Sequence, residues 1–142
     1  MIFDYINNMI LKGLLPIFFL GIGFNQTPSQ DWIPYYKDKK ITISYLSKIC
    51  EDQQNGFAFE YYFIQVQNLT EQRLIVNFNK SPEGKNKEED QVAFVLAPNE
   101  VKTGSCNYSP VKLRIYKTDR RPNKSSPVSS FALSKISTIE VN

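Results

Sequence analysis

The residues with the clearest chemistry in this 142-residue chain are its two cysteines, Cys50 and Cys106. In an oxidising compartment an even pair of cysteines is most simply explained as a disulfide. The alternative is two free thiols with a catalytic or metal-binding role. That alternative lacks the short C-x-x-C spacing, and the chain contains no histidine that could act as a partner. We therefore predict a Cys50–Cys106 disulfide.

The absence of histidine also narrows the range of enzyme chemistry. Histidine is the commonest metal ligand and the usual base of nucleophilic triads. Three adjacent acids, Glu88, Glu89 and Asp90, could offer oxygen ligands to Ca²⁺, but their spacing matches no EF-hand, so we interpret them as a solvated loop. No pair among the 14 acidic residues is singled out for glycoside hydrolysis. We predict a protein that is not an enzyme, with no catalytic residues, no metal site and no cofactor.

Aromatic residues are concentrated between positions 57 and 63. Phe57, Phe59, Tyr61, Tyr62 and Phe63 place rings on both faces of one expected strand. We interpret them as core packing, covered in part by the segment that precedes the first strand. The alternative is a ligand platform formed by Phe57, Phe59 and Tyr61, which could hold sugar rings or the apolar surface of a partner. Solvent exposure of these three side chains distinguishes the two interpretations.

A second concentration, of basic side chains, follows near the C-terminus. We interpret it as a solvated face, because Asp119 interrupts it; the alternative is a binding patch for an anionic polymer, a lipopolysaccharide or an acidic protein. A net charge of +3 is too small to imply nucleic acid as a partner. The basic residues are Lys112, Arg114, Lys117, Arg120 and Arg121, with Lys124 beyond them.

The first residues have the pattern of an export signal. An uncharged apolar run from Gly13 to Phe24 follows Lys12, and it is shorter than the roughly 20 residues that a membrane-spanning helix needs. We predict a helical signal peptide over residues 1–25, cleaved after Gly23 or near Asn25, and no membrane span in the mature form. An uncleaved N-terminal helix is the alternative. The mature protein is expected to be secreted or periplasmic.

The rest of the chain alternates between short apolar-polar runs and turn-forming clusters, as strands and their connections do. The stretches 80–90 and 118–130 are rich in polar residues, and we expect them to be exposed loops. The stretches 57–67 and 73–79 are predicted to pair as a hairpin. In the last run, Phe131 and Leu133 and then Ile139 and Val141 fit a long or bulged strand. The expected strands are residues 41–46, continuing to Cys50, then 57–67, 73–79, 92–97, 100–105, 111–117 and 131–141.

About seven short strands at this spacing favour an all-β fold, a sandwich of two antiparallel sheets of the immunoglobulin or fibronectin III type. A closed barrel is the main alternative. The expected organisation is a signal peptide at residues 1–25, an irregular lead-in at 26–39 and one sandwich domain at 40–142. In the lead-in, Trp32 either caps the core or begins an edge strand.

The order of these strands and of several short motifs resembles small, exported, uncharacterised β-sandwich proteins of Bacteroidota. That resemblance covers roughly Trp32 to Asn142, supports the Cys50–Cys106 pairing and implies an immunoglobulin-like sandwich outside the cytoplasm. It implies no catalytic residue. The motifs are Val66-Gln67-Asn68-Leu69-Thr70, Leu96-Ala97-Pro98-Asn99-Glu100, Gly104-Ser105-Cys106, Leu113-Arg114-Ile115-Tyr116 and Phe131-Ala132-Leu133.

These observations lead to one functional hypothesis and two alternatives. The hypothesis is an exported, non-enzymatic module that recognises a protein or envelope component through the loops at 80–90 and 118–130. The first alternative is a carbohydrate-binding or carbohydrate-active envelope protein, which as an enzyme would need two convergent carboxylates in a cleft. The second is a structural envelope protein that assembles through its edge strands.

Overall fold

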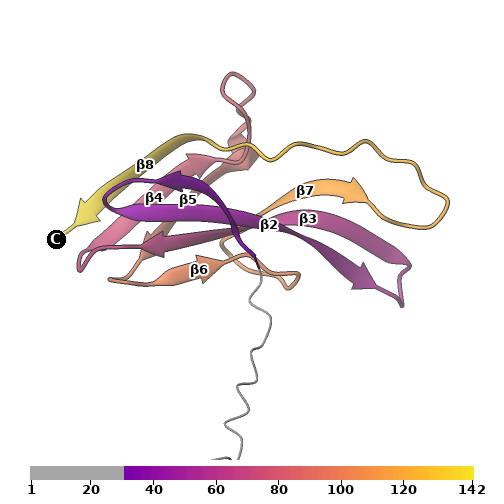
Figure 1. Ribbon diagram of the computed structural model, residues 1–142, viewed down its shortest axis with the longest axis horizontal. Coiled ribbons are helices and arrows are strands. Elements are labelled where there is room, and N and C mark those ends of the chain that lie inside the picture. Colours follow the sequence, from indigo (N-terminus) through magenta and orange to yellow (C-terminus); the bar gives the residue numbers. More distant parts are fainter. Residues whose placement is uncertain (1–30) are drawn as a thin grey trace, which may run out of the picture. The chain divides into compact units, whose positions relative to one another are not determined.

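The fold is almost entirely β, as predicted. A computed structural model describes residues 31–142, in which eight strands form two antiparallel sheets packed as a sandwich (Figure 1). The signal peptide expected at residues 1–25 lies outside the described residues. The immunoglobulin or fibronectin III type stays a prediction. The strands are β1 (Ile33–Lys37), β2 (Ile41–Asp52), β3 (Phe57–Asn68), β4 (Arg73–Asn79), β5 (Gln91–Leu96), β6 (Val101–Thr103), β7 (Arg114–Asp119) and β8 (Ser134–Val141), with a 3₁₀ turn, η1 (Glu88–Asp90), before β5.

The larger sheet is built on a long hairpin. Strands β2 and β3 pair without interruption from Ile41 opposite Asn68 to Asp52 opposite Phe57. Strand β1 pairs with the outer edge of β2, while the other edge of β3 is shared by β6 and β7. The turn between β2 and β3 includes Gly56 at a φ of 70°, a left-handed conformation that glycine adopts at little cost.

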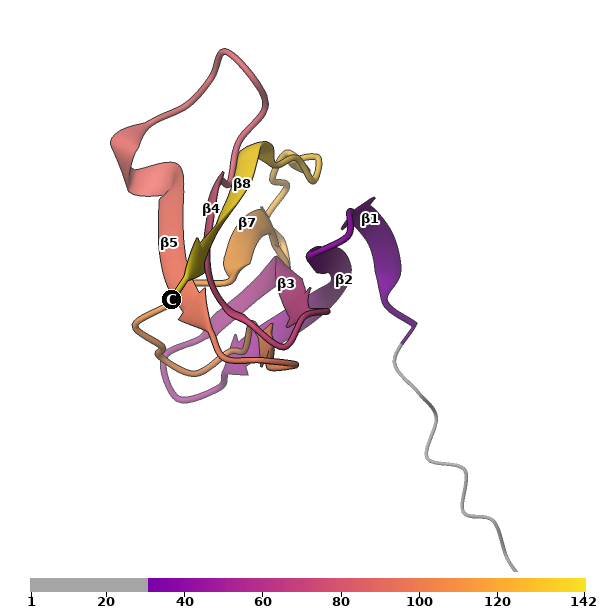
Figure 2. The ribbon, with the colours of Figure 1, turned by 90° about the vertical axis from the view of Figure 1, so that its left-hand side faces the viewer.

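The smaller sheet has the order β5-β4-β8 and supplies half of the core. Figure 2 shows β4, β5 and β8 in one layer, with β2 and β3 in the other. Inward side chains of both sheets meet between the layers, and each large aliphatic residue buried there contributes about 1.5–3 kcal/mol to folding. The innermost side chains are Ile41, Ile43, Ile64 and Val66 from the larger sheet and Leu74, Val76, Phe78 and Leu96 from the smaller one.

The predicted hairpin of residues 57–67 with 73–79 is wrong. Strand β3 pairs with β2, β6 and β7, whereas β4 lies in the other sheet between β5 and β8. The connection between them is a corner held by Asn68, whose side chain is completely buried. Its amide nitrogen donates to the carbonyl oxygens of Gln72 and Ala97, and its amide oxygen accepts from Thr70. The chain therefore changes sheets here instead of folding back on itself.

The lead-in contains a regular element, which corrects its description as irregular. Strand β1 is an edge strand that begins directly after Trp32, close to one of the two roles expected for that residue. A bulge at Tyr35 lets Ile33 and Tyr36 both oppose core-facing residues of β2. The Tyr35 hydroxyl accepts from the backbone N–H of Leu133 and donates to its carbonyl oxygen, both at 3.0 Å. These bonds fasten the edge strand to the start of the last strand.

The two polar loops are both tied to the sandwich. The 80–90 loop is closed at its base by the Lys80 N–H donating to the carbonyl oxygen of Asp90. The 120–133 connection runs past the end of β7 (Figure 1). It is tied to the inward face of β3 by the Tyr62 hydroxyl, which donates to the carbonyl oxygen of Ser129. Only part of each loop is therefore free to reach a partner.

The last strand is shorter than predicted and changes face. Lys135 adopts a φ of 53°, and the pairing of β8 with β4 is irregular at the same end. As a result Ile139 points away from the core and is 56% exposed.

Residues 31–142 include no helix that is long and apolar enough to cross a membrane.

Candidate functional site

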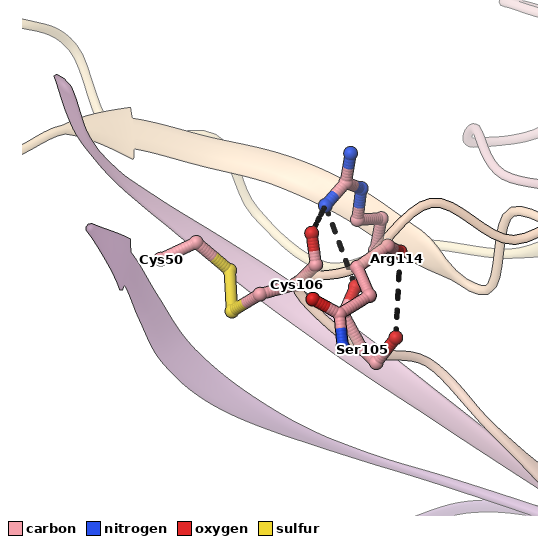
Figure 3. The surroundings of a disulfide bond; sticks show 5 residues. Cys50, Ser105, Cys106 and Arg114 are labelled. Atoms are coloured by element: carbon pink, nitrogen blue, oxygen red, sulfur yellow. Dashed lines mark hydrogen bonds between the residues drawn. A yellow bond between two sulfur atoms is a disulfide. The ribbon is translucent and has the colours of Figure 1, made fainter. Parts of the chain in front are cut away.

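The predicted disulfide joins Cys50 to Cys106, with 5.5 Å between the two Cα atoms. Cys50 lies on β2, and Cys106 lies in a loop that leaves the opposite edge of β3 at Gly104 and returns at Leu113. The bond therefore holds this loop, residues 104–113, across the outer face of β3. We call the loop together with its disulfide the disulfide strap. Figure 3 shows Arg114 beside it, where its guanidinium donates to the carbonyl oxygens of Ser105 and Cys106.

Next to this strap, four aromatic rings lie on the outer face of β3 and β7. The rings of Phe57 and Phe59 stack with centroids 5.5 Å apart, and Tyr116 contacts Phe59 and Tyr61 edge-on at 6.1 Å each. Two arginines border the rings. The Arg114 guanidinium lies 4.5 Å from the Tyr61 centroid, and that of Arg121 lies 5.8 Å from the Phe59 centroid. We call this set, Phe57, Phe59, Tyr61, Tyr116, Arg114 and Arg121, the aromatic–arginine face.

The exposure of this face decides between the two interpretations of the aromatic strand. Phe57 is 43% exposed and Tyr116 is 46% exposed, and Phe59 and Tyr61 are half-buried. By contrast, Tyr62 and Phe63 are buried, so the core interpretation holds for these two residues only. The rings of the predicted platform are thus accessible, and they border an open hollow of about 480 Å³ next to the disulfide.

Two of the five predicted basic residues, Lys117 and Arg120, are held by one buried acid. Glu60, which is 8% exposed, pairs with Lys117 at 3.0 Å and with Arg120. Burial by itself raises the pKa of the Glu60 carboxyl, but hydrogen bonds from Lys117 and Arg120 outweigh that effect and the pKa is lowered. Glu60 is therefore a charged anchor on the inward face of β3, and these two cations are not free to bind an anion.

Arg121 is held in the same way on the opposite face. Its guanidinium and its backbone N–H both donate to Asp119, and Lys124 lies 3.2 Å from the same carboxylate. These hydrogen bonds, those of Arg121 first, lower the pKa of the Asp119 carboxyl. Lys112 lies in the strapped loop, where its carbonyl oxygen accepts from Lys80. The predicted basic residues are thus divided among separate surroundings instead of forming one patch.

The acidic residues do not form a catalytic arrangement. Glu60 is next to Phe59 on β3, and Asp119 is opposite Phe59, so alternation places the two carboxylates on different faces of the sheet. Within residues 31–142 no three histidine, cysteine or acidic side chains gather as a metal site would require. Glu88, Glu89 and Asp90 form the 3₁₀ turn η1 and have no buried member.

Tyr116 is the functional candidate that sequence reasoning missed. It belongs to the aromatic–arginine face because β7 pairs with β3, opposite Tyr61. Its alternation with Ile115 indicates an outward direction, but nothing in the sequence says which strand lies beside it. Arg114 and Arg121 were grouped by charge, whereas the structure places them against aromatic rings.

No protein-family model, curated protein or solved structure matches the chain.

Proposed function

We propose that this protein is an exported, non-enzymatic binding module that recognises a protein partner through the aromatic–arginine face. The observation that carries the proposal is the accessibility of Phe57 and Tyr116 in a cluster that arginines border. Tyrosine, phenylalanine and arginine are enriched in protein interfaces, where a few such residues supply most of the binding free energy.

The rigidity of this face supports the same proposal. Strand pairing fixes the backbone beneath the rings, and the disulfide, together with Arg114, holds the neighbouring loop. A side chain that is already held in place loses less conformational entropy when a partner binds. The formed disulfide also supports export, because such bonds persist mainly in oxidising compartments.

The charges of the buried carboxylates support a binding role over a catalytic one. Glu60 and Asp119 are each paired with two basic side chains, and in each case the pKa is lowered. A general acid needs a raised pKa, so neither carboxylate suits that role. The face therefore offers contact area and positive edges, which suit binding.

Site-specific photo-crosslinking in envelope extracts tests the proposal. A crosslinker at position 57 is expected to give a partner adduct, whereas crosslinkers at Lys85 and Val128, in the two polar loops, are expected to give none. The double substitution Phe57→Ala and Tyr116→Ala should then weaken binding of the purified partner by about 2 kcal/mol, roughly 30-fold in Kd.

Tyr108→Ala provides the matched control, because Tyr108 is 86% exposed but lies outside the aromatic–arginine face. It should leave the affinity unchanged. Adducts from positions 85 or 128 alone would instead support recognition by the loops and contradict the proposal.

A further inference from the structure

A second surface lies on the outer face of the larger sheet, on strands β1, β2 and β3 away from the disulfide strap. The residues of this surface line an open groove of about 450 Å³, within the range of about 300–1,000 Å³ typical of small-molecule sites. Trp32 and Pro34 lie on one side of the groove. The outward residues of the central hairpin supply the rest, namely Thr42, Ser44, Gln65 and Gln67.

Strand register explains why these polar residues meet. Thr42 is opposite Gln67 and Ser44 is opposite Gln65, so hydroxyl and amide groups form two adjacent rows. The neighbouring β6 adds Thr103, whose hydroxyl accepts from the Gln65 amide at 3.3 Å. That bond holds the Gln65 side chain in place and leaves its amide oxygen available to accept a hydrogen bond from a ligand. Of the described residues that line the groove, only Lys37 carries a charge.

We infer that this groove binds a neutral oligosaccharide. One face of a pyranose ring is made of C–H groups and packs against an aromatic ring, which Trp32 supplies. The hydroxyls at the edge of the sugar both donate and accept hydrogen bonds, as the amide and hydroxyl side chains across the groove also do. The lack of acidic or clustered basic groups favours an uncharged ligand over a polyanion.

This inference does not rest on the proposed function, because the aromatic–arginine face shares no residue with the groove. The aromatic–arginine face is also less suited to sugars, since guanidinium groups already lie near its rings. The two surfaces can therefore be tested separately in one protein.

Trp32 is the only tryptophan of the chain, so tryptophan fluorescence reports on the groove alone. The full chain is titrated with maltotetraose, cellotetraose, mannotetraose and the tetramer of N-acetylglucosamine while tryptophan fluorescence and heat of binding are recorded. At least one probe should change the fluorescence and release heat, and a heparin fragment should not compete with it. Gln67→Ala and Trp32→Ala should each weaken binding about tenfold or more, the latter measured by heat alone.

Phe57→Ala serves as the control and should bind the saccharide as tightly as the unchanged protein. Far-ultraviolet circular dichroism of each variant verifies that its fold is retained. Absence of fluorescence change and heat with all four probes would overturn the inference. Binding that survives Trp32→Ala but is lost in Phe57→Ala would also overturn it, since the sugar would then lie on the aromatic–arginine face.

Discussion

Removal of the disulfide should cost this fold a large part of its stability. Cys50 and Cys106 are separated by 56 positions in the sequence. In the chain-entropy model, a disulfide that closes a loop of this length lowers the entropy of the unfolded chain by about 14 cal/mol/K. This destabilises the unfolded state by about 4 kcal/mol at 25 °C. Small domains are stable by only about 5–15 kcal/mol in total. The double substitution Cys50→Ser and Cys106→Ser should therefore lower the free energy of unfolding by about 4 kcal/mol.

Urea denaturation followed by circular dichroism measures this difference. The midpoint should fall, and the slope m should rise, because an unfolded chain without the crosslink exposes more surface. The native spectrum should persist without urea, since Arg114 still donates to the carbonyl oxygens of residues 105 and 106. The unchanged protein, reduced with dithiothreitol, should unfold at the same urea concentration as the double variant.

Two outcomes would refute the reasoning. A loss below about 1 kcal/mol would mean that the unfolded chain is already compact and gains little entropy when the bond is removed. A double variant that is destabilised far more than the reduced protein would show that the serine substitutions, and not loop entropy, cause the loss.

Three further substitutions probe the contacts that shape the fold. Gly104→Ala should lower stability by about 1–3 kcal/mol in thermal unfolding, because the added Cβ would lie 1.9 Å from the carbonyl oxygen of Leu113; an unchanged Tm would contradict this. Asn68→Ala should cost about 1–3 kcal/mol by urea denaturation, since it removes the amide that donates to the carbonyl oxygens of Gln72, Ala97 and the buried Leu96 at the sheet corner. Glu60→Gln should destabilise the protein at neutral pH. That cost should shrink below about pH 4, because a carboxylate with a lowered folded pKa stabilises fully above its unfolded pKa and loses this contribution as the pH falls towards the folded pKa; a cost independent of pH would count against the ion pairs.

Much of the fold could be predicted because alternation within a strand is a local property. Residues 73–79 are predicted as a strand from their alternation, and Leu74, Val76 and Phe78, which share one face of it, are all buried in a strand with those bounds. The two cysteines were likewise predicted to pair from their number and spacing, and they do. The period of two determines the direction of each side chain relative to its own neighbours.

The choice of strand partners was decided only by the tertiary structure. The same alternation is compatible with several neighbours, so it could not show that β3 pairs with β2 while β4 joins the other sheet. Those pairings bring Tyr116 beside Tyr61 and place Gln65 and Gln67 opposite Ser44 and Thr42. The alternation within each strand shows only which of its side chains share a face. Only the summed long-range contacts of both sheets determine which of them reach solvent and together form a surface that can bind.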